Sequence, residues 1–122
     1  MEWENEPDRE EFEHAGLKCL ILRHSELKHL CGYVALVKGH SEYGKHYDEI
    51  VANPHGGLTF AQEGNGLKWE EGYWWVGFDC AHAGDLVPGV ELLPLSTPLI
   101  YRDLTYVRAG VKSLAEQLAE KI

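Results

Sequence analysis

Basic residues are scarce in this chain, which has 11 lysines and arginines against 20 aspartates and glutamates and a net charge of −9. Proteins that bind the phosphate backbone of a nucleic acid need a basic surface, so direct nucleic-acid binding is not expected. The apolar runs are too short to cross a bilayer, and the acidic N-terminus differs from a secretory signal or a transit peptide. The sequence therefore predicts a cytoplasmic protein that does not enter a membrane.

Cysteine is also rare. The three cysteines (Cys19, Cys31 and Cys80) have no close spacing, which favours free thiols in a reducing compartment over a disulfide framework. The chain lacks a Walker loop, a Gly-x-Gly-x-x-Gly fingerprint and a Gly-x-Ser-x-Gly elbow. These absences exclude the classical NTPase, dinucleotide-binding and serine-hydrolase classes.

Much of the negative charge lies at the start of the chain, where residues 2–13 contain seven acidic residues and one basic residue. Such charge density opposes burial, so we expect residues 1–14 to form a solvated, frayed arm that folding does not require, with a short helix ending near Gly16. Residues 15–122 then form a single α+β domain. Because Trp3 and Phe12 interrupt the acidic run, the alternative is a nucleic-acid mimic or a lid that docks on a basic partner.

Four segments have the composition of β-strands: residues 17–22, 30–37, 58–62 and 73–80. A short polar turn separates the first two, which predicts an antiparallel hairpin. The segment 73–80 is the strongest, because it is rich in aromatic and β-branched residues.

The last part of the chain has helical periodicity, and Thr97 or Asp103 can cap its start. We expect this seam to pack on the sheet, and a helix contact in a homo-oligomer is the alternative. The sum is an α+β fold, a mainly antiparallel sheet with a C-terminal helix packed on one face. The seam consists of Leu104, Val107, Val111, Leu114 and Leu118.

The string "WWVGFDCAHAGD" joins the strongest strand to several side chains that can perform chemistry. Strand alternation puts Cys80 and His82 on one face and Asp79, together with Trp75, on the other. Cys80 then follows the apolar residues of its face and is expected to be a buried small residue rather than a metal ligand. A nucleophilic Cys80 ranks below acid–base chemistry, because Phe-Asp-Cys matches no cysteine-hydrolase signature. Alternation also predicts that Trp74 and Trp75 lie on opposite faces of the sheet.

The candidate catalytic residues are His55, Asp79, His82 and Asp85, all in loops or at strand ends. Imidazole titrates near neutral pH and a carboxylate can orient it, so a His–Asp pair suits acid–base chemistry. We expect His55 and His82 to come together, since His55 precedes the predicted strand 58–62 and His82 follows the predicted strand 73–80, which we expect to be neighbours. Aspartates in such positions also cap turns and accept backbone N–H bonds, which is the alternative for Asp79 and Asp85.

Further residues are candidates for holding a ligand, because imidazole, glycine-rich backbone and an aromatic face suit a polar or nucleotide-like molecule. These are His40, His46, Gly56, Gly57 and Trp75. Imidazole, carboxylate and thiolate also bind zinc, but the recognised zinc spacings are absent, so the sequence leaves a metal undecided and names no cofactor.

The strings "CGYV", "GH..YGK.YD", "HGGLTF", "WWVGFDCAHAGD" and "YRDLTYVRAGVKSLAEQL", which span about Leu30 to Leu118, together resemble a family of small, mostly uncharacterised proteins of bacteriophages, prophages and bacteria. The resemblance implies a genomic setting and a role that acts on host defence or metabolism. It implies no activity, and it does not extend to the acidic segment.

Three functions follow as hypotheses. The first is a phage-type accessory protein, with a counter-defence role, that binds or sequesters a small nucleotide-like ligand at the edge formed by the four catalytic candidates. The second is a small hydrolase that uses the same His and Asp residues, with or without a metal. The third is an acidic inhibitor that binds a host protein through residues 1–14.

Overall fold

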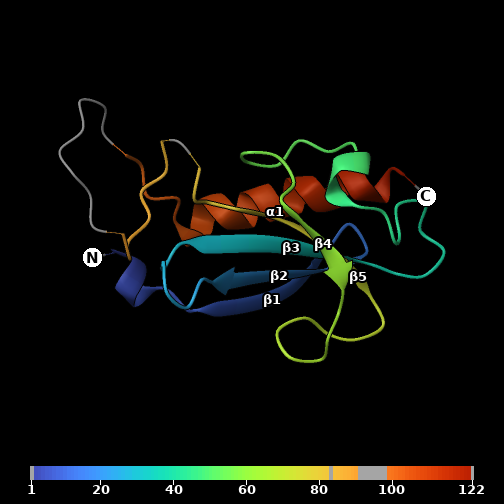
Figure 1. The fold of residues 1–122 in the computed structure, drawn as a ribbon, viewed down its shortest axis with the longest axis horizontal. Helices are drawn as coiled ribbons and strands as arrows, with labels where there is room; N and C mark the ends of the chain where they lie inside the picture. The colour runs from blue at the N-terminus through green and yellow to red at the C-terminus, as the bar shows by residue number, and fades with distance from the viewer. Residues whose placement is uncertain (1, 83, 91–98, 122) are drawn as a thin grey trace.

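The computed structural model describes residues 2–82, 84–90 and 99–121. Within these residues a five-stranded antiparallel sheet, in the order β1-β2-β3-β5-β4, carries one long helix, α1, on one face (Figure 1). The predicted α+β fold is confirmed. The elements are η1 Glu2–Asn5, β1 Arg9–His14, β2 Leu17–Arg23, β3 Leu30–Leu36, η2 Tyr47–Glu49, β4 Phe60–Glu63, β5 Trp74–Asp79 and α1 Leu104–Ala119.

The helix α1 begins where the side chain of Asp103 accepts a 2.8 Å hydrogen bond from the backbone N–H of Tyr106. Asp103 was one of the two predicted caps, and the other, Thr97, lies outside the described residues. None of the helices in the described part of the chain combines the length and apolar character needed to cross a membrane. The predicted seam is confirmed as core packing, since four of its residues have no exposed surface: Val107, Val111, Leu114 and Leu118.

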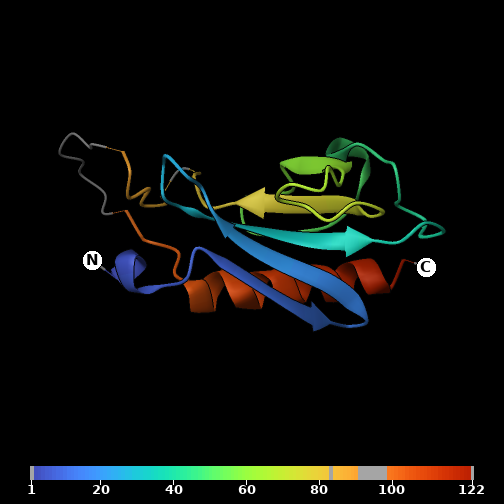
Figure 2. The same cartoon turned by 90° about the horizontal axis from the view of Figure 1, so that it is seen from below.

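Close contact between the helix and the sheet depends on Gly32 in β3. A Cβ at this position would lie 2.4 Å from a methyl group of Val111 and 2.9 Å from the ring of Phe78. Because real Cβ atoms do not approach so closely, only glycine lets the helix pack this near. Figure 2 shows the result, with α1 lying along the sheet and the two ends of the chain at opposite ends of the molecule.

The other face of the sheet has a smaller apolar cluster around Trp75 and Tyr33. The connection between β4 and β5 covers it, with the ring of Trp69 at 5.5 Å from that of Tyr33. Trp75 is 2% exposed and its indole N–H donates to the backbone oxygen of Glu70 at 2.9 Å. The prediction that Trp75 offers a stacking face to a ligand is therefore wrong, whereas the predicted separation of Trp74 and Trp75 onto opposite faces is confirmed.

The acidic segment does not fray as expected, because residues 9–14 form β1 and pair with β2 along its length. No helix precedes Gly16 directly. Exposure alternates along this strand, so that Phe12 packs against the core while Glu11 and Glu13 face solvent. Charge on the outer positions of an edge strand is compatible with folding and discourages pairing with other chains.

Candidate functional site

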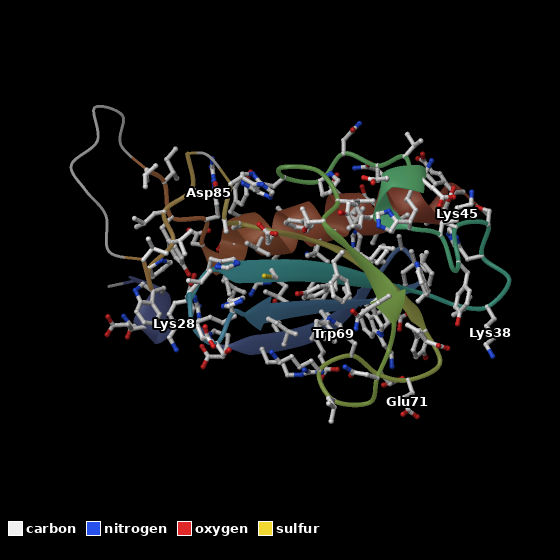
Figure 3. All side chains as sticks on the ribbon, in the orientation of Figure 1. Lys28, Lys38, Lys45, Trp69, Glu71 and Asp85 are labelled. Carbon is white, nitrogen blue, oxygen red and sulfur yellow. The ribbon has the colours of Figure 1, made fainter. Side chains whose placement is uncertain are left out.

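The candidate site lies where β5 ends, beside the start of α1. Asp79 is the last residue of β5, the segment after it carries His82 and Asp85, and the turn before β4 carries His55. Figure 3 labels Asp85 in this region, above the sheet and beside the first turns of α1. The pairing of Phe60 in β4 with Gly77 in β5 brings the two turns to the same end of the sheet.

Asp85 is the best-connected residue of the site, although its side chain has no exposed surface. Its carboxylate lies 2.7 Å from Nε2 of His55, and it accepts hydrogen bonds from the backbone N–H of His82 at 3.0 Å and from Nε of Arg102 at 2.8 Å. Burial raises the pKa of Asp85, but the hydrogen bonds from Arg102 and His55 outweigh it, so the pKa lies below its ordinary value. An ionised Asp85 accepts a hydrogen bond from the Nε2–H group of His55 and so orients the ring.

The second ring nitrogen of His55 points toward a hydroxyl group. Nδ1 lies 2.7 Å from the Tyr106 hydroxyl, which can donate to it when Nε2 carries the proton. Tyr106 is 39% exposed, so the chain of hydrogen bonds runs from a buried carboxylate through an imidazole to an accessible hydroxyl. The hydroxyl opens on a groove of about 270 Å³ lined by Asn53, Pro54, His55, Tyr106, Ala109, Gly110 and Ser113.

Arg102 and Tyr106 belong to the site, but the sequence interpretation missed both of them. The guanidinium carbon of Arg102 lies 4.8 Å from the centre of the Tyr106 ring, while its Nε donates to Asp85. Arg102 lies just before the N-cap Asp103 and Tyr106 lies in the first turn of α1. Their closeness to the predicted cap Asp103 was the available signal, but it does not reveal that Asp85 lies opposite.

Asp79 and His82 form a second pair, with Asp79 Oδ1 3.2 Å from Nε2 of His82. Asp79 also accepts hydrogen bonds from the backbone N–H of Ala81 at 3.0 Å and from the Thr59 hydroxyl at 3.1 Å. The expectation that Asp79 accepts backbone N–H bonds is confirmed. His82 Nε2 is buried and forms no well-aligned hydrogen bond with any described residue.

The two histidine rings come together as predicted, with their centres 5.8 Å apart and one ring edge-on to the other. Gly56 holds this arrangement, because a Cβ there would lie 2.2 Å from Cδ2 of His82. Its φ of 70° is a second reason for glycine. Gly57 has no atom within 4 Å of its Cβ position, so only its φ of 85° favours glycine there.

Two of the predicted ligand-binding residues lie elsewhere. His40 is buried near the end of α1, where Nε2 lies 2.8 Å from the backbone oxygen of Leu118. His46 caps η2. The backbone oxygen of the neighbouring Lys45 accepts a hydrogen bond from the indole N–H of Trp74, which lies at the opposite end of β5 from Asp79. The prediction that these histidines contribute to the site is therefore wrong, because the loop that holds them follows the far end of β3.

His29 is a site neighbour to which the sequence interpretation assigned no role. It is 4% exposed and stacks on His24 with ring centres 5.0 Å apart, and its Nδ1 has no partner among the described residues. Burial lowers the pKa of His29, and the nearby His24 lowers it further. The pairing of Cys31 with Asp79 places His29 near the end of β5. This position follows from the order of the strands in the sheet.

The geometry does not support Cys80 as a nucleophile or as a metal ligand. Cys80 is 1% exposed and packs in the helix-side core, as predicted. Burial raises the pKa of its thiol, and the negative charge of Asp85 raises it further, so a thiolate is disfavoured. Within residues 2–82, 84–90 and 99–121, no group of three or more His, Cys, Asp or Glu side chains converges to hold a metal ion.

Comparison of the chain with family models, with curated proteins and with solved structures finds no match. The resemblance to phage and bacterial proteins therefore stays a prediction, and the site must be interpreted from its own geometry.

Proposed function

We propose that this edge is an acid–base site that hydrolyses a small polar substrate, with His55 as the general base and Asp85 as the residue that orients it. One observation carries the proposal. A fully buried carboxylate binds one nitrogen of an imidazole, while the other nitrogen reaches an exposed hydroxyl at a groove. This is the arrangement that proton transfer requires, because the base is fixed in one tautomer and one orientation.

The proton path follows from the hydrogen bonds. Asp85 holds the proton on His55 Nε2, which leaves the Nδ1 lone pair directed at Tyr106. A water molecule that takes the place of the Tyr106 hydroxyl can give its proton to Nδ1 and attack the substrate. The ionised Asp85 then stabilises the imidazolium that forms, while Arg102 keeps the carboxylate in place.

Sequestration of a nucleotide-like ligand by a phage-type accessory protein is less well supported. That hypothesis needed a stacking face and extra imidazoles, whereas Trp75 is buried and His40 lies near the far end of α1. An inhibitor that acts through a free acidic arm is also less well supported, because residues 9–14 pair within the sheet. The phage or bacterial setting implied by the resemblance remains part of the proposal, with a small host molecule as the substrate.

The test compares hydrolysis of p-nitrophenyl acetate, p-nitrophenyl phosphate and bis(p-nitrophenyl) phosphate by the wild type and by His55→Gln, with EDTA present. General acid–base catalysis contributes roughly 10²–10⁴-fold, so His55→Gln should lose about 100-fold or more in kcat/KM on any ester that the wild type cleaves. Thermal unfolding of both proteins shows whether the variant is folded.

The matched control is His46→Gln, which removes an exposed imidazole at the opposite end of β5. It should retain wild-type rates. Equal rates for the wild type and His55→Gln would refute the proposed base, and equal losses in both variants would indicate a general effect of histidine removal.

A further inference from the structure

Each of the two histidines at the site has a carboxylate of its own. His55 pairs with Asp85 at 2.7 Å and His82 pairs with Asp79 at 3.2 Å, while the ring centres are 5.8 Å apart. One imidazole is enough for acyl transfer, because it accepts the nucleophile's proton and later gives it to the leaving group. Building on the acid–base function above, we propose that His82 is a general acid opposite His55 and that the substrate is a small phosphodiester.

The two pairs differ in the partners of their carboxylates and in their position at the groove. Arg102 donates to Asp85, so this carboxylate is shared between a guanidinium and the His55 ring. The other donors to Asp79 are neutral, namely the N–H of Ala81 and the hydroxyl of Thr59. We assign the base to His55, whose Nδ1 meets the Tyr106 hydroxyl at the groove, and the acid to His82, which has its own carboxylate in Asp79.

The remaining titratable groups near the pair leave this assignment in place. His29, packed before β3, has its pKa lowered mainly by burial, so it adds no positive charge at neutral pH. His24 stacks on it and accepts the backbone N–H of Leu27 at its Nδ1. From α1, the group that faces His55 is the neutral hydroxyl of Tyr106.

The geometry also indicates which nitrogen of His82 meets the substrate. Nε2 is buried beside Asp79, which leaves Nδ1 as the nitrogen that can donate outward. Gly56 packs against the ring and fixes its position relative to His55. The His82 side chain is 29% exposed, so a ligand can reach it.

The reaction balances with water as the only co-reactant. Water bound at His55 Nδ1 attacks phosphorus, a P–O bond forms, and the water proton passes to Nδ1. The P–O bond to the leaving group breaks, the electron pair stays on the leaving oxygen, and that oxygen takes the proton from His82 Nδ1. A phosphomonoester and an alcohol leave, and both imidazoles then recover their states by exchange with solvent.

Displacement at phosphorus explains why two imidazoles would be needed. The attacking and leaving oxygens lie roughly in line on opposite sides of phosphorus, so one group removes a proton while another supplies one. The guanidinium of Arg102 lies 4.8 Å from the ring of Tyr106, which lines the groove, and its positive charge would favour the other oxygens of the phosphate. A net charge of −9 and a groove of about 270 Å³ favour a small diester, such as a cyclic mononucleotide, over a nucleic acid.

The experiment uses two phosphodiesters that differ in their need for a general acid. The leaving group of bis(p-nitrophenyl) phosphate departs without a proton, whereas adenosine 2′,3′-cyclic monophosphate releases an alkoxide that must be protonated. His82→Gln should lose about 100-fold or more in kcat/KM on the cyclic nucleotide and less than about fivefold on the nitrophenyl diester. His55→Gln should lose on both, and His46→Gln on neither.

A second variant, Asp79→Asn, keeps the side-chain shape and should show the same dependence on the leaving group, even if His82→Gln fails to fold in a thermal scan. Equal losses on both diesters would overturn the general-acid role of His82 while leaving the His55 base intact. Unchanged rates in His55→Gln would instead overturn the proposed function. Absence of turnover of both diesters by the wild type would overturn the phosphodiester assignment.

Discussion

The carboxylate of Glu6 accepts a hydrogen bond from the backbone N–H of Leu104, 2.7 Å away, at the first turn of α1. The same carboxylate also lies 3.2 Å from Nη2 of Arg23 and contacts the Tyr101 hydroxyl. The side chains of Arg23 and Glu6 are only 3% and 13% exposed. The acidic N-terminal segment is thereby joined to the helix that carries Tyr106, so it supports the end of the molecule where the candidate site lies.

Glu6→Ala should lower the free energy of unfolding by about 3–5 kcal/mol, because it leaves the buried Arg23 without one carboxylate partner and α1 without a partner for its first N–H. Urea unfolding measures this loss. The matched change Glu13→Ala, at an exposed position of β1, should stay within about 0.5 kcal/mol. Similar small losses in both variants would mean that the segment is as dispensable as its charge first suggested.

Trp75→Ala should behave as a core mutation rather than as the loss of a ligand contact. Its side chain is buried and its indole N–H is bonded to the β4–β5 connection, so the expected loss is about 3–5 kcal/mol of unfolding free energy. Leu67→Ala, in the same connection but 85% exposed, should cost less than about 0.5 kcal/mol. A stable Trp75→Ala protein would show that the cluster with Tyr33 contributes little.

The elements that the sequence predicted well are those with local periodicity. The seam of α1 repeats at helical spacing, and the strand Trp74–Asp79 alternates in a way that correctly buried Cys80. The approach of His55 to His82 was also predicted correctly, since His55 precedes β4, His82 follows β5 and the two strands are adjacent.

The features that sequence reasoning missed depend on contacts between distant segments. The strand β1 has few apolar residues, and its charge is accommodated partly by Arg108, which lies 98 positions away from Glu10 in the sequence. Nε and Nη2 of Arg108 donate to the Glu10 carboxylate at 2.8 and 2.7 Å. Arg102 and Tyr106 join the site because α1 begins beside the end of β5. No local pattern specifies these contacts, since each is set by how the sheet and helix pack.

Gly56→Ala and Gly57→Ala form a matched pair that isolates the contact with His82. Both residues have positive φ, so each alanine should cost about 1–2 kcal/mol of stability from backbone strain. Only Gly56→Ala also forces the His82 ring to move, which should add a further loss of about 1–3 kcal/mol. In a double-mutant cycle measured by urea unfolding, His82→Ala should recover the added loss at position 56 and nothing at position 57. Equal costs at the two positions would show that the ring yields without resistance.

Asp85→Asn should change how stability depends on pH. The pKa of Asp85 is lowered in the folded protein, so its ionised form contributes stability that is present above the unfolded value of about 3.9 and is lost as pH falls through the lower folded value. The wild type should therefore lose more unfolding free energy than Asp85→Asn when urea unfolding is compared at pH 6 and pH 3. At pH 6 the variant should be the less stable protein, because an amide cannot replace the charge that binds Arg102 and His55. Glu63→Gln, at an exposed position ending β4, should follow the wild-type pH dependence. Parallel pH curves for the wild type and Asp85→Asn would show that the carboxylate is not held ionised by its partners, and the orientation of His55 would then need another cause.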